Sequence, residues 1–263
     1  MGDGMRASIF KTSVAALMFF STGVSAVAAE IKVMSAGAVK PMVLALGEEF
    51  ARETGHKVEF AFGTVGAMRK RFESGEAADL VVLSVSAIEG MEKSGAFVPG
   101  SRIDLGRVVT GVVIREGAPV PDISTVEAFK QALLNARSVA YTDPNAGGSS
   151  GTFFVGLVER LGIAEAIGKK AVLRRGGHDV ATAVANGEAE IGTTFISEIL
   201  PVKGAKVAGL LPKEIANVNT YTAAISAKSA SREAAAALIG KLTAAATRER
   251  WIAAGLEPAF GGK

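Results

Sequence analysis

Residues 143–152 read Asp143-Pro-Asn-Ala-Gly-Gly-Ser-Ser-Gly-Thr152, a loop rich in glycine and serine between two apolar segments. The run Ser138-Val-Ala-Tyr141 before the loop is typical of a buried strand, and the apolar residues that follow it, from Phe153 to Leu161, have helical spacing. Such a turn gathers backbone N–H groups, hydroxyls and the positive end of a helix dipole, so it predicts an anion site. The simpler interpretation is a strand–helix connection in which Ser or Thr caps the helix.

The alternation of strand-like and helix-like segments extends along the chain on both sides of this loop. A capping box, Ser124-Thr-Val-Glu127, predicts the start of one helix, and an alanine-rich helix is expected over residues 232–246. Repeated alternation predicts an α/β fold whose sheets are mainly parallel and flanked by helices. Further strands are expected at residues 31–35, 57–62, 80–83, 171–174 and 191–195.

Residues 1–29 have the features of a secretory signal peptide. Arg6 and Lys11 precede the apolar run 14–20, and small residues follow up to Ala29. The run is too short for a secure membrane span, and no later stretch is long and apolar enough for one. Cleavage after Ala28 or Ala29 is expected to leave an exported, soluble chain in a bacterial periplasm.

Composition narrows the class of ligand. The chain has no cysteine, so neither a disulfide nor a cysteine-linked lipid anchor can form, and its two histidines disfavour a structural zinc site. Residues 1–29 include Asp3, Arg6 and Lys11, so their removal changes the net charge from +3 to +2, which suggests neither nucleic acid nor an anionic membrane as partner. The loop 143–152 lacks the Gly-Lys-Ser/Thr ending of a P-loop. We therefore expect a small anionic ligand, no cofactor and no metal.

Three motifs resemble those of a known family: EIKVMSAGA at residues 30–38, GEAADL at 75–80 and GEAEIG at 187–192. They are similar to periplasmic molybdate-binding proteins, class II solute-binding proteins of ABC importers, a branch of which includes a periplasmic aconitate isomerase. The resemblance implies a two-lobed class II periplasmic binding protein fold, a ligand cleft between the lobes, a monomer and an importer permease as partner. The expected organisation is lobe 1 at residues 30–110 plus 220–263 and lobe 2 at residues 111–219.

The resemblance also implies which residues surround the ligand. In this family, hydroxyls and backbone N–H groups at helix starts hold the oxyanion. The serine of the first loop falls at Ala38 and the tyrosine of the site falls at Phe195, so two hydroxyls are missing here. The resemblance, the glycine-rich loop and the arginines near the predicted helix starts together give the expected ligand-binding residues: Ala38, Thr64, Val65, Gly66, Arg69, Gly148, Ser149, Ser150, Gly151, Thr152, Gly177, His178 and Phe195.

The missing hydroxyls and several arginines favour an organic di- or tricarboxylate over molybdate. A site that leaves an oxyanion oxygen unpaired loses much of its discrimination. Arg69, Arg71, Arg174 and Arg175 lie near the predicted loops, and a guanidinium group matches a planar carboxylate. Arg69 is expected at the cleft, and most of the others are expected to be solvated charges. The third alternative is tungstate, sulfate or another oxyanion held by the hydroxyls that are present.

Two functions fit this cleft. The first is a periplasmic solute-binding protein that traps a small anion by hinge closure for an importer. The second is a periplasmic tricarboxylate isomerase that interconverts cis- and trans-aconitate, which requires donors for carboxylates and a base for an allylic proton. His178 is the candidate base and Glu198 is a weaker one. The simpler interpretation of His178 is a neutral imidazole bonded to a nearby backbone group.

Overall fold

The computed structural model describes residue 1 and residues 28–261, so nearly all of the expected signal peptide lies outside the described residues. The strands are β1 (Glu30–Ala36), β2 (Lys57–Gly63), β3 (Leu80–Ser84), β4 (Ile103–Arg115), β5 (Val139–Thr142), β6 (Ala171–Arg174), β7 (Ile191–Phe195), β8 (Ala205–Leu210), β9 (Val218–Ile225) and β10 (Glu257–Pro258). The α-helices are α1 (Lys40–Thr54), α2 (Val65–Glu73), α3 (Val85–Glu92), α4 (Val126–Asn135), α5 (Ser149–Arg160), α6 (Ala164–Gly168), α7 (Gly177–Ala185), α8 (Ile196–Ile199), α9 (Arg232–Leu242) and α10 (Arg248–Ala253). The 3-10 helices are η1 (Gly37–Val39), η2 (Pro144–Ala146), η3 (Lys213–Ile215) and η4 (Ala245–Thr247).

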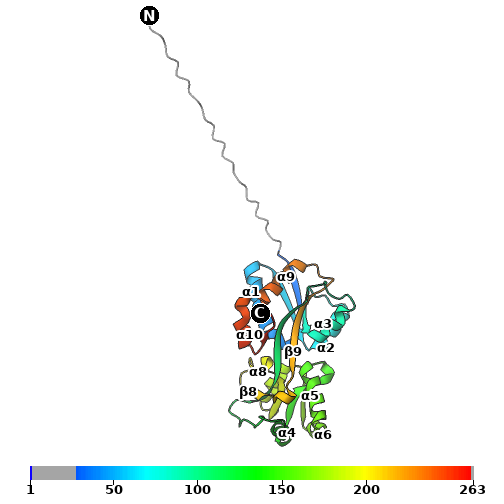
Figure 1. Cartoon of the computed structure of the whole chain (residues 1–263), viewed down its shortest axis with the longest axis vertical. Coiled ribbons are helices and arrows are strands. Elements are labelled where there is room, and N and C mark those ends of the chain that lie inside the picture. The colour runs from blue at the N-terminus through cyan, green and yellow to red at the C-terminus, as the bar shows by residue number, and fades with distance from the viewer. Residues whose placement is uncertain (2–27, 262–263) are drawn as a thin grey trace.

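The molecule has two lobes joined by the long strand β4. The main path of strands runs β2-β1-β3-β9-β4-β7-β5-β6. β4 pairs with β9 from Ile103 to Val109 and with β7 from Thr110 to Ile114, so one strand belongs to both halves of the sheet. Figure 1 shows the first lobe, with α1, α2, α3, α9 and α10, at one end of this strand and the second lobe, with α4, α5, α6 and α8, at the other. This is the two-lobed α/β fold expected from the sequence.

Each lobe is built on three parallel strands: β2, β1 and β3 in the first, and β6, β5 and β7 in the second. β9 is antiparallel to β3, and β4 is antiparallel to β9 and β7, so the sheets are mainly rather than wholly parallel. The carboxyl ends of parallel strands meet at one edge of a sheet, and ligands of open α/β sheets bind outside that edge. The loops that follow β1, β2, β5, β6 and β7 are therefore in position to form a site.

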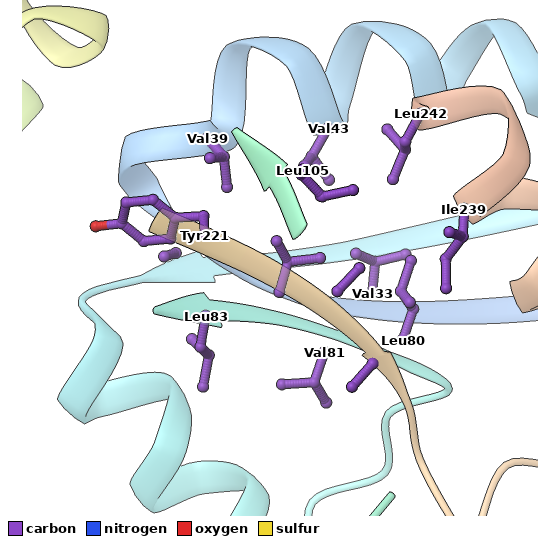
Figure 2. Close-up of a cluster of buried hydrophobic side chains, with 14 of the residues drawn as sticks. Val33, Val39, Val43, Leu80, Val81, Leu83, Leu105, Tyr221, Ile239 and Leu242 are labelled. Carbon is purple, nitrogen blue, oxygen red and sulfur yellow. The ribbon is translucent and has the colours of Figure 1, made fainter. Parts of the chain in front are cut away.

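The first lobe has a continuous apolar core beneath this edge. Figure 2 shows its central cluster, in which Val33 of β1 and Leu80 of β3 lie beside Leu242 of α9. All three side chains are buried, and a strand with both faces covered reads as a continuous apolar run, as β3 does. At the end of the cluster the Tyr221 hydroxyl points away from the apolar side chains. The core thus positions one polar atom at the edge where the lobes meet.

Two local expectations were wrong. Thr125, not Ser124, is the N-cap of α4: its hydroxyl accepts the Ala128 N–H at 3.1 Å, while the backbone N–H of Ser124 bonds to an Asp122 side-chain oxygen. The alanine-rich helix ends at Leu242, four residues before the expected end. There the Thr243 hydroxyl donates to the carbonyl of Ile239 at 2.9 Å, which satisfies a terminal acceptor without another helical turn.

Among residues 28–261, the helices are all too short or too polar to cross a membrane.

Candidate functional site

A cavity of about 420 Å³ lies between the two lobes, at the carboxyl ends of their parallel strands. Its volume falls within the range of about 300–1,000 Å³ found for small-molecule sites. Both lobes supply its walls, since Gly37 and Val65 come from the first lobe and Gly148 and Gly177 from the second. The expected site residues that line it are Ala38, Thr64, Val65, Gly148, Ser149, Ser150, Gly177, His178 and Phe195.

Helix starts converge on this cavity. α2, α5 and α7 begin at Val65, Ser149 and Gly177, all of which line it. The first N–H groups of a helix have no partner inside the helix and carry the positive end of its dipole, so such ends favour an anion. At the start of α2 the N–H groups of Gly66 and Ala67 are already bonded, to the Gly147 carbonyl and the Thr64 hydroxyl, so the loop before α5 stays the main prediction for an anion site.

The serines of the glycine-rich loop do not cap α5. Gly148 occupies the N-cap position, and no side chain caps the helix there. The Ser150 hydroxyl lies 3.3 Å from the Thr142 hydroxyl, and the Ser149 hydroxyl is within hydrogen-bonding reach of Tyr221. The structure thus does not support the simpler interpretation of this loop, with Ser or Thr as cap.

The two lobes touch directly at one side of the cavity. The Gly66 N–H donates to the Gly147 carbonyl oxygen at 3.0 Å, and the Thr64 hydroxyl donates to the carbonyl of Ala146. A Cβ on Gly66 would lie 2.8 Å from the Cα of Gly147, which is closer than side-chain carbons approach backbone. Glycine is therefore required here for the loop after β2 to reach the loop after β5.

Three other expected residues lie outside the lining. Arg69 is exposed on α2, where its Nε bonds to Glu73 at 2.8 Å. The exposed Thr152 has its hydroxyl bonded to the Gly148 carbonyl at 3.1 Å. Gly151 packs against β5, where a Cβ would lie 1.9 Å from the Thr142 carbonyl oxygen, so its smallness serves the packing of α5.

The cavity has two cationic side chains and an imidazole at its surface. Lys40, Arg175 and His178 line it and are exposed, and the Lys40 ammonium lies 5.4 Å from the centre of the Phe62 ring. Sequence reasoning missed Lys40, although it stands only two residues after Ala38 at the start of α1. Arg174 instead forms an ion pair with Glu188, which leaves Arg175 as the lining member of that pair of arginines.

Glu198 is the buried acid of the site. Its side chain lines the cavity, is 9% exposed and accepts the Thr194 hydroxyl at 2.8 Å. Burial raises the pKa of Glu198 to about 7, although hydrogen bonds from Thr194 and from the N–H groups of Gly177 and Phe195 act in the opposite direction. A carboxyl group with this pKa exchanges its proton near neutral pH.

Tyr221 supplies a hydroxyl close to the position where Phe195 has none. The two rings pack edge to face, with centroids 6.3 Å apart, and both line the cavity. Burial, followed by the charge of Glu198, raises the pKa of Tyr221, so its hydroxyl stays protonated and can donate. Sequence reasoning missed this role, because Tyr221 reaches the site through the antiparallel pairing of β9 with β3 and β4.

No three His, Cys, Asp or Glu side chains within the described part of the chain come together as a metal site would require. The polar groups around the cavity are hydroxyls, backbone N–H groups, the cations Lys40 and Arg175, the His178 imidazole and the acids Asp179 and Glu198. Such a donor set can bind a small anion, and it includes groups able to exchange a proton.

The fold and this cleft define a two-lobed binding protein for a small solute. A family model described as "Bacterial extracellular solute-binding protein" matches residues 31–257. The chain belongs to this family.

Named relatives place it more narrowly. An aconitate isomerase from Pseudomonas sp is 32% identical over 234 residues, which cover 87% of each chain. The molybdate-binding protein ModA from Azotobacter vinelandii is 28% identical over 197 residues, covering 70% of this chain and 71% of ModA. The solved periplasmic molybdate-binding protein of the same organism shares the fold, with a TM-score of 0.69 at 19% identity over 86% of this chain and 98% of that one. These findings confirm the resemblance to a molybdate-binding-like family that includes aconitate isomerase.

Proposed function

We propose that this protein binds a small di- or tricarboxylate in its cleft and isomerises it by moving a proton and a double bond, as the name of the Pseudomonas relative indicates for aconitate. We further propose that it acts in the periplasm, after removal of residues 1–29. Of the two functions expected from the sequence, this is the one that the chemistry of the cleft supports better.

The observation that carries the proposal is the combination of cations and neutral donors around one cavity. Lys40, Arg175 and His178 line it together with the hydroxyl-bearing Ser149 and Tyr221. Several carboxylates on one small molecule need several separate positive groups, and charge-assisted hydrogen bonds to such groups are about twice as strong as neutral ones. A compact tetrahedral oxyanion would still lack the hydroxyl that is missing at Ala38, although Tyr221 supplies one near Phe195.

The second candidate is a solute-binding protein that delivers the same class of acid to an importer permease. The contact of Gly66 with Gly147 favours it, because lobes that meet over a cavity can enclose a ligand by hinge closure. For such a motion we propose that the chain crosses between the lobes at residues 110–111 and 219–220, the boundaries expected from the sequence. The two candidates share the cleft and differ in whether a bound acid exchanges a proton.

The test is proton NMR of cis-aconitate, trans-aconitate and citrate in D2O with the purified protein. New isomer signals, or solvent deuterium in the carbon skeleton, are the expected result. Line broadening with neither change would leave the solute-binding function and remove the isomerase. No interaction with any of the three acids would refute the carboxylate proposal, and an oxyanion panel that includes molybdate would follow.

A pair of arginine variants checks that the cleft is where aconitate binds. Arg175→Ala is expected to weaken aconitate binding about 10- to 100-fold, because a hydrogen bond to a charged group contributes about 1.5–3 kcal/mol. Arg137→Ala is the matched control, since Arg137 is exposed and paired with Glu190 away from the cavity. Equal affinities of the two variants in calorimetric titration would contradict the placement of the carboxylate site.

A further inference from the structure

Glu198 lies where a bound anion would otherwise meet the start of α7. Gly177 is the first residue of that helix, and its N–H lies close enough to the Glu198 carboxyl group to act on the pKa of that group. A Cβ on Gly177 would lie 1.9 Å from Oε2 of Glu198 and 2.1 Å from the Thr194 hydroxyl, so no side chain fits there. The protein therefore holds one of its own carboxylates at a helix end that favours negative charge.

The carboxyl group also reaches across to the first lobe. Its Oε2 accepts the Thr194 hydroxyl, while its Oε1 lies 3.2 Å from the position that a Cβ of Gly37 would take in η1. Gly37 and Gly177 line the cavity on opposite lobes, and Glu198 lines it between them. A molecule held between the lobes would therefore contact this carboxyl group.

The hydrogen bonds hold Glu198 in one orientation. It accepts the Thr194 hydroxyl at 2.8 Å, and as the third residue of α8 it lies near the N–H of Phe195, the residue at the N-cap position of this helix. That is half of a capping box, a pattern in which Gln serves as well as Glu. The capping bond orients the group and does not require its charge, so the two properties can be separated by substitution.

The other titratable groups around this cavity suit an anionic ligand that exchanges a proton with Glu198. Lys40, Arg175 and His178 line it as possible counter-ions for the ligand, while Asp179 adds a negative charge and Tyr221 a neutral hydroxyl. Burial, and to a smaller extent the charge of Asp179, raise the pKa of Glu198 to about 7, where a carboxyl group can both accept and return a proton at neutral pH.

We propose that Glu198, rather than His178, is the acid–base group of the cleft; this inference rests on the proposed isomerase function. The Glu198 carboxylate takes a proton from the CH2 group of aconitate. The C–H electron pair becomes a new C=C bond as the former double bond shifts toward the neighbouring carboxylate. Return of the proton from Glu198 to the far carbon completes the allylic shift and regenerates the carboxylate. Atoms and electrons balance with no oxidant, reductant or further reactant.

His178 is less well placed for this step. Its ring is exposed, and within the described residues no hydrogen bond fixes its orientation, because the bond at this residue is from the Thr182 hydroxyl to the His178 carbonyl. A base needs a defined position relative to the proton that it removes. His178 is instead suited to donate a hydrogen bond to a ligand carboxylate at the surface of the cavity.

The test compares Glu198→Gln with His178→Gln, each made in the whole protein without residues 1–29. Gln keeps the capping bond and the volume but cannot take a proton. We expect Glu198→Gln to lower aconitate turnover about 10²- to 10⁴-fold, the usual contribution of a general base, and to abolish deuterium exchange. Its affinity for aconitate by calorimetry is expected to stay within about tenfold of wild type, while His178→Gln loses affinity but keeps deuterium exchange.

A pH profile separates an acid–base role from a merely structural one. Wild-type kcat/KM is expected to rise through about pH 7, because the carboxylate form of Glu198 is the active base. Glu198→Asp, which keeps the acid but shortens the side chain, should show low activity with a retained pH dependence, whether or not Glu198→Gln folds well. A pH-independent profile between pH 5 and 9 would contradict the assignment.

The outcomes distinguish the two proposals. If wild type is active and Glu198→Gln keeps more than one tenth of the wild-type rate, the role of Glu198 is overturned and the isomerase function stands. Loss of exchange in His178→Gln but not in Glu198→Gln would transfer the role to His178. Wild type that neither isomerises aconitate nor exchanges its protons would refute the isomerase function, and the role of Glu198 with it.

Discussion

The buried acid of the cleft makes a quantitative prediction about stability that is independent of any ligand. The folded protein raises the pKa of Glu198 from its ordinary 4.5 to about 7, so the folded chain keeps this proton to a higher pH than the unfolded chain does. As pH rises from about 4.5 to 7, Glu198 ionises in the unfolded chain but stays protonated in the folded one, so the free energy of unfolding falls. Above pH 7 the group is ionised in both states, and the free energy of unfolding falls no further. Since a pKa difference of one corresponds to about 1.4 kcal/mol, the loss amounts to roughly 3 kcal/mol.

Glu198→Gln removes this titration while keeping an acceptor for the Phe195 N–H. The variant is therefore expected to gain stability relative to wild type between pH 4.5 and pH 8, by roughly 3 kcal/mol. For a chain of this size that corresponds to about 6–12 °C in the difference between the two melting temperatures. Any cost of poorer hydrogen bonding in the variant is the same at every pH and does not enter this difference.

The assay is thermal unfolding of both proteins by circular dichroism at pH 4.5, 6, 7 and 8, in one buffer series of constant ionic strength. Glu165→Gln serves as the matched control, because Glu165 is exposed on α6 and paired with Lys169 at the surface. Its melting temperature should differ from that of wild type by the same small amount throughout. A difference for Glu198→Gln that stays constant within about 2 °C from pH 4.5 to 8 would refute the reasoning.

Two glycine predictions follow from the geometry. Gly151→Ala should destabilise the protein by about 3 kcal/mol or more in denaturant unfolding, because its Cβ would lie 1.9 Å from the Thr142 carbonyl oxygen. Gly240→Ala in α9, where a Cβ meets nothing within 4 Å, should instead add up to about 1 kcal/mol of stability. Effects of the same sign in the two variants would contradict the packing described. Gly66→Ala would place a Cβ 2.8 Å from the Gly147 Cα and should weaken aconitate binding about tenfold in calorimetric titration, because overpacking of about 1–3 kcal/mol penalises the closed lobes; unchanged affinity would count against closure at this contact.

Local sequence pattern predicted the elements well where apolar periodicity was strong. The expected strands at 31–35, 57–62 and 80–83 correspond to β1, β2 and β3 within one residue at each end. The pattern was weaker at helix ends, where Thr125 rather than Ser124 caps α4. Adjacent hydroxyls compete for one capping position, and the backbone angles that choose between them depend on the whole loop.

The site was less predictable because it is assembled from both lobes. Motif resemblance pointed to Thr64, Ser149 and Gly177, all of which line the cavity. Nearness to a predicted loop suggested Arg69 as well, but Arg69 lies on the exposed face of α2 with Glu73 as its partner. A few residues of helix decide whether a long side chain faces the cleft or water, and sequence distance from a loop does not contain that information.

The order of residues along the chain is enough to establish the class of this protein: short apolar strands, each followed by a helix, bury their surface as α/β lobes, and glycine-rich helix starts favour an anion in the cleft. Which groups share that cleft depends on how the two lobes pack in space. Tyr221 arrives through an antiparallel strand, and Lys40 through the first turn of α1. Glu198 becomes an acid that titrates near neutral pH because neighbouring elements remove it from water, and the pKa of a carboxyl group depends on that burial rather than on its neighbours in sequence.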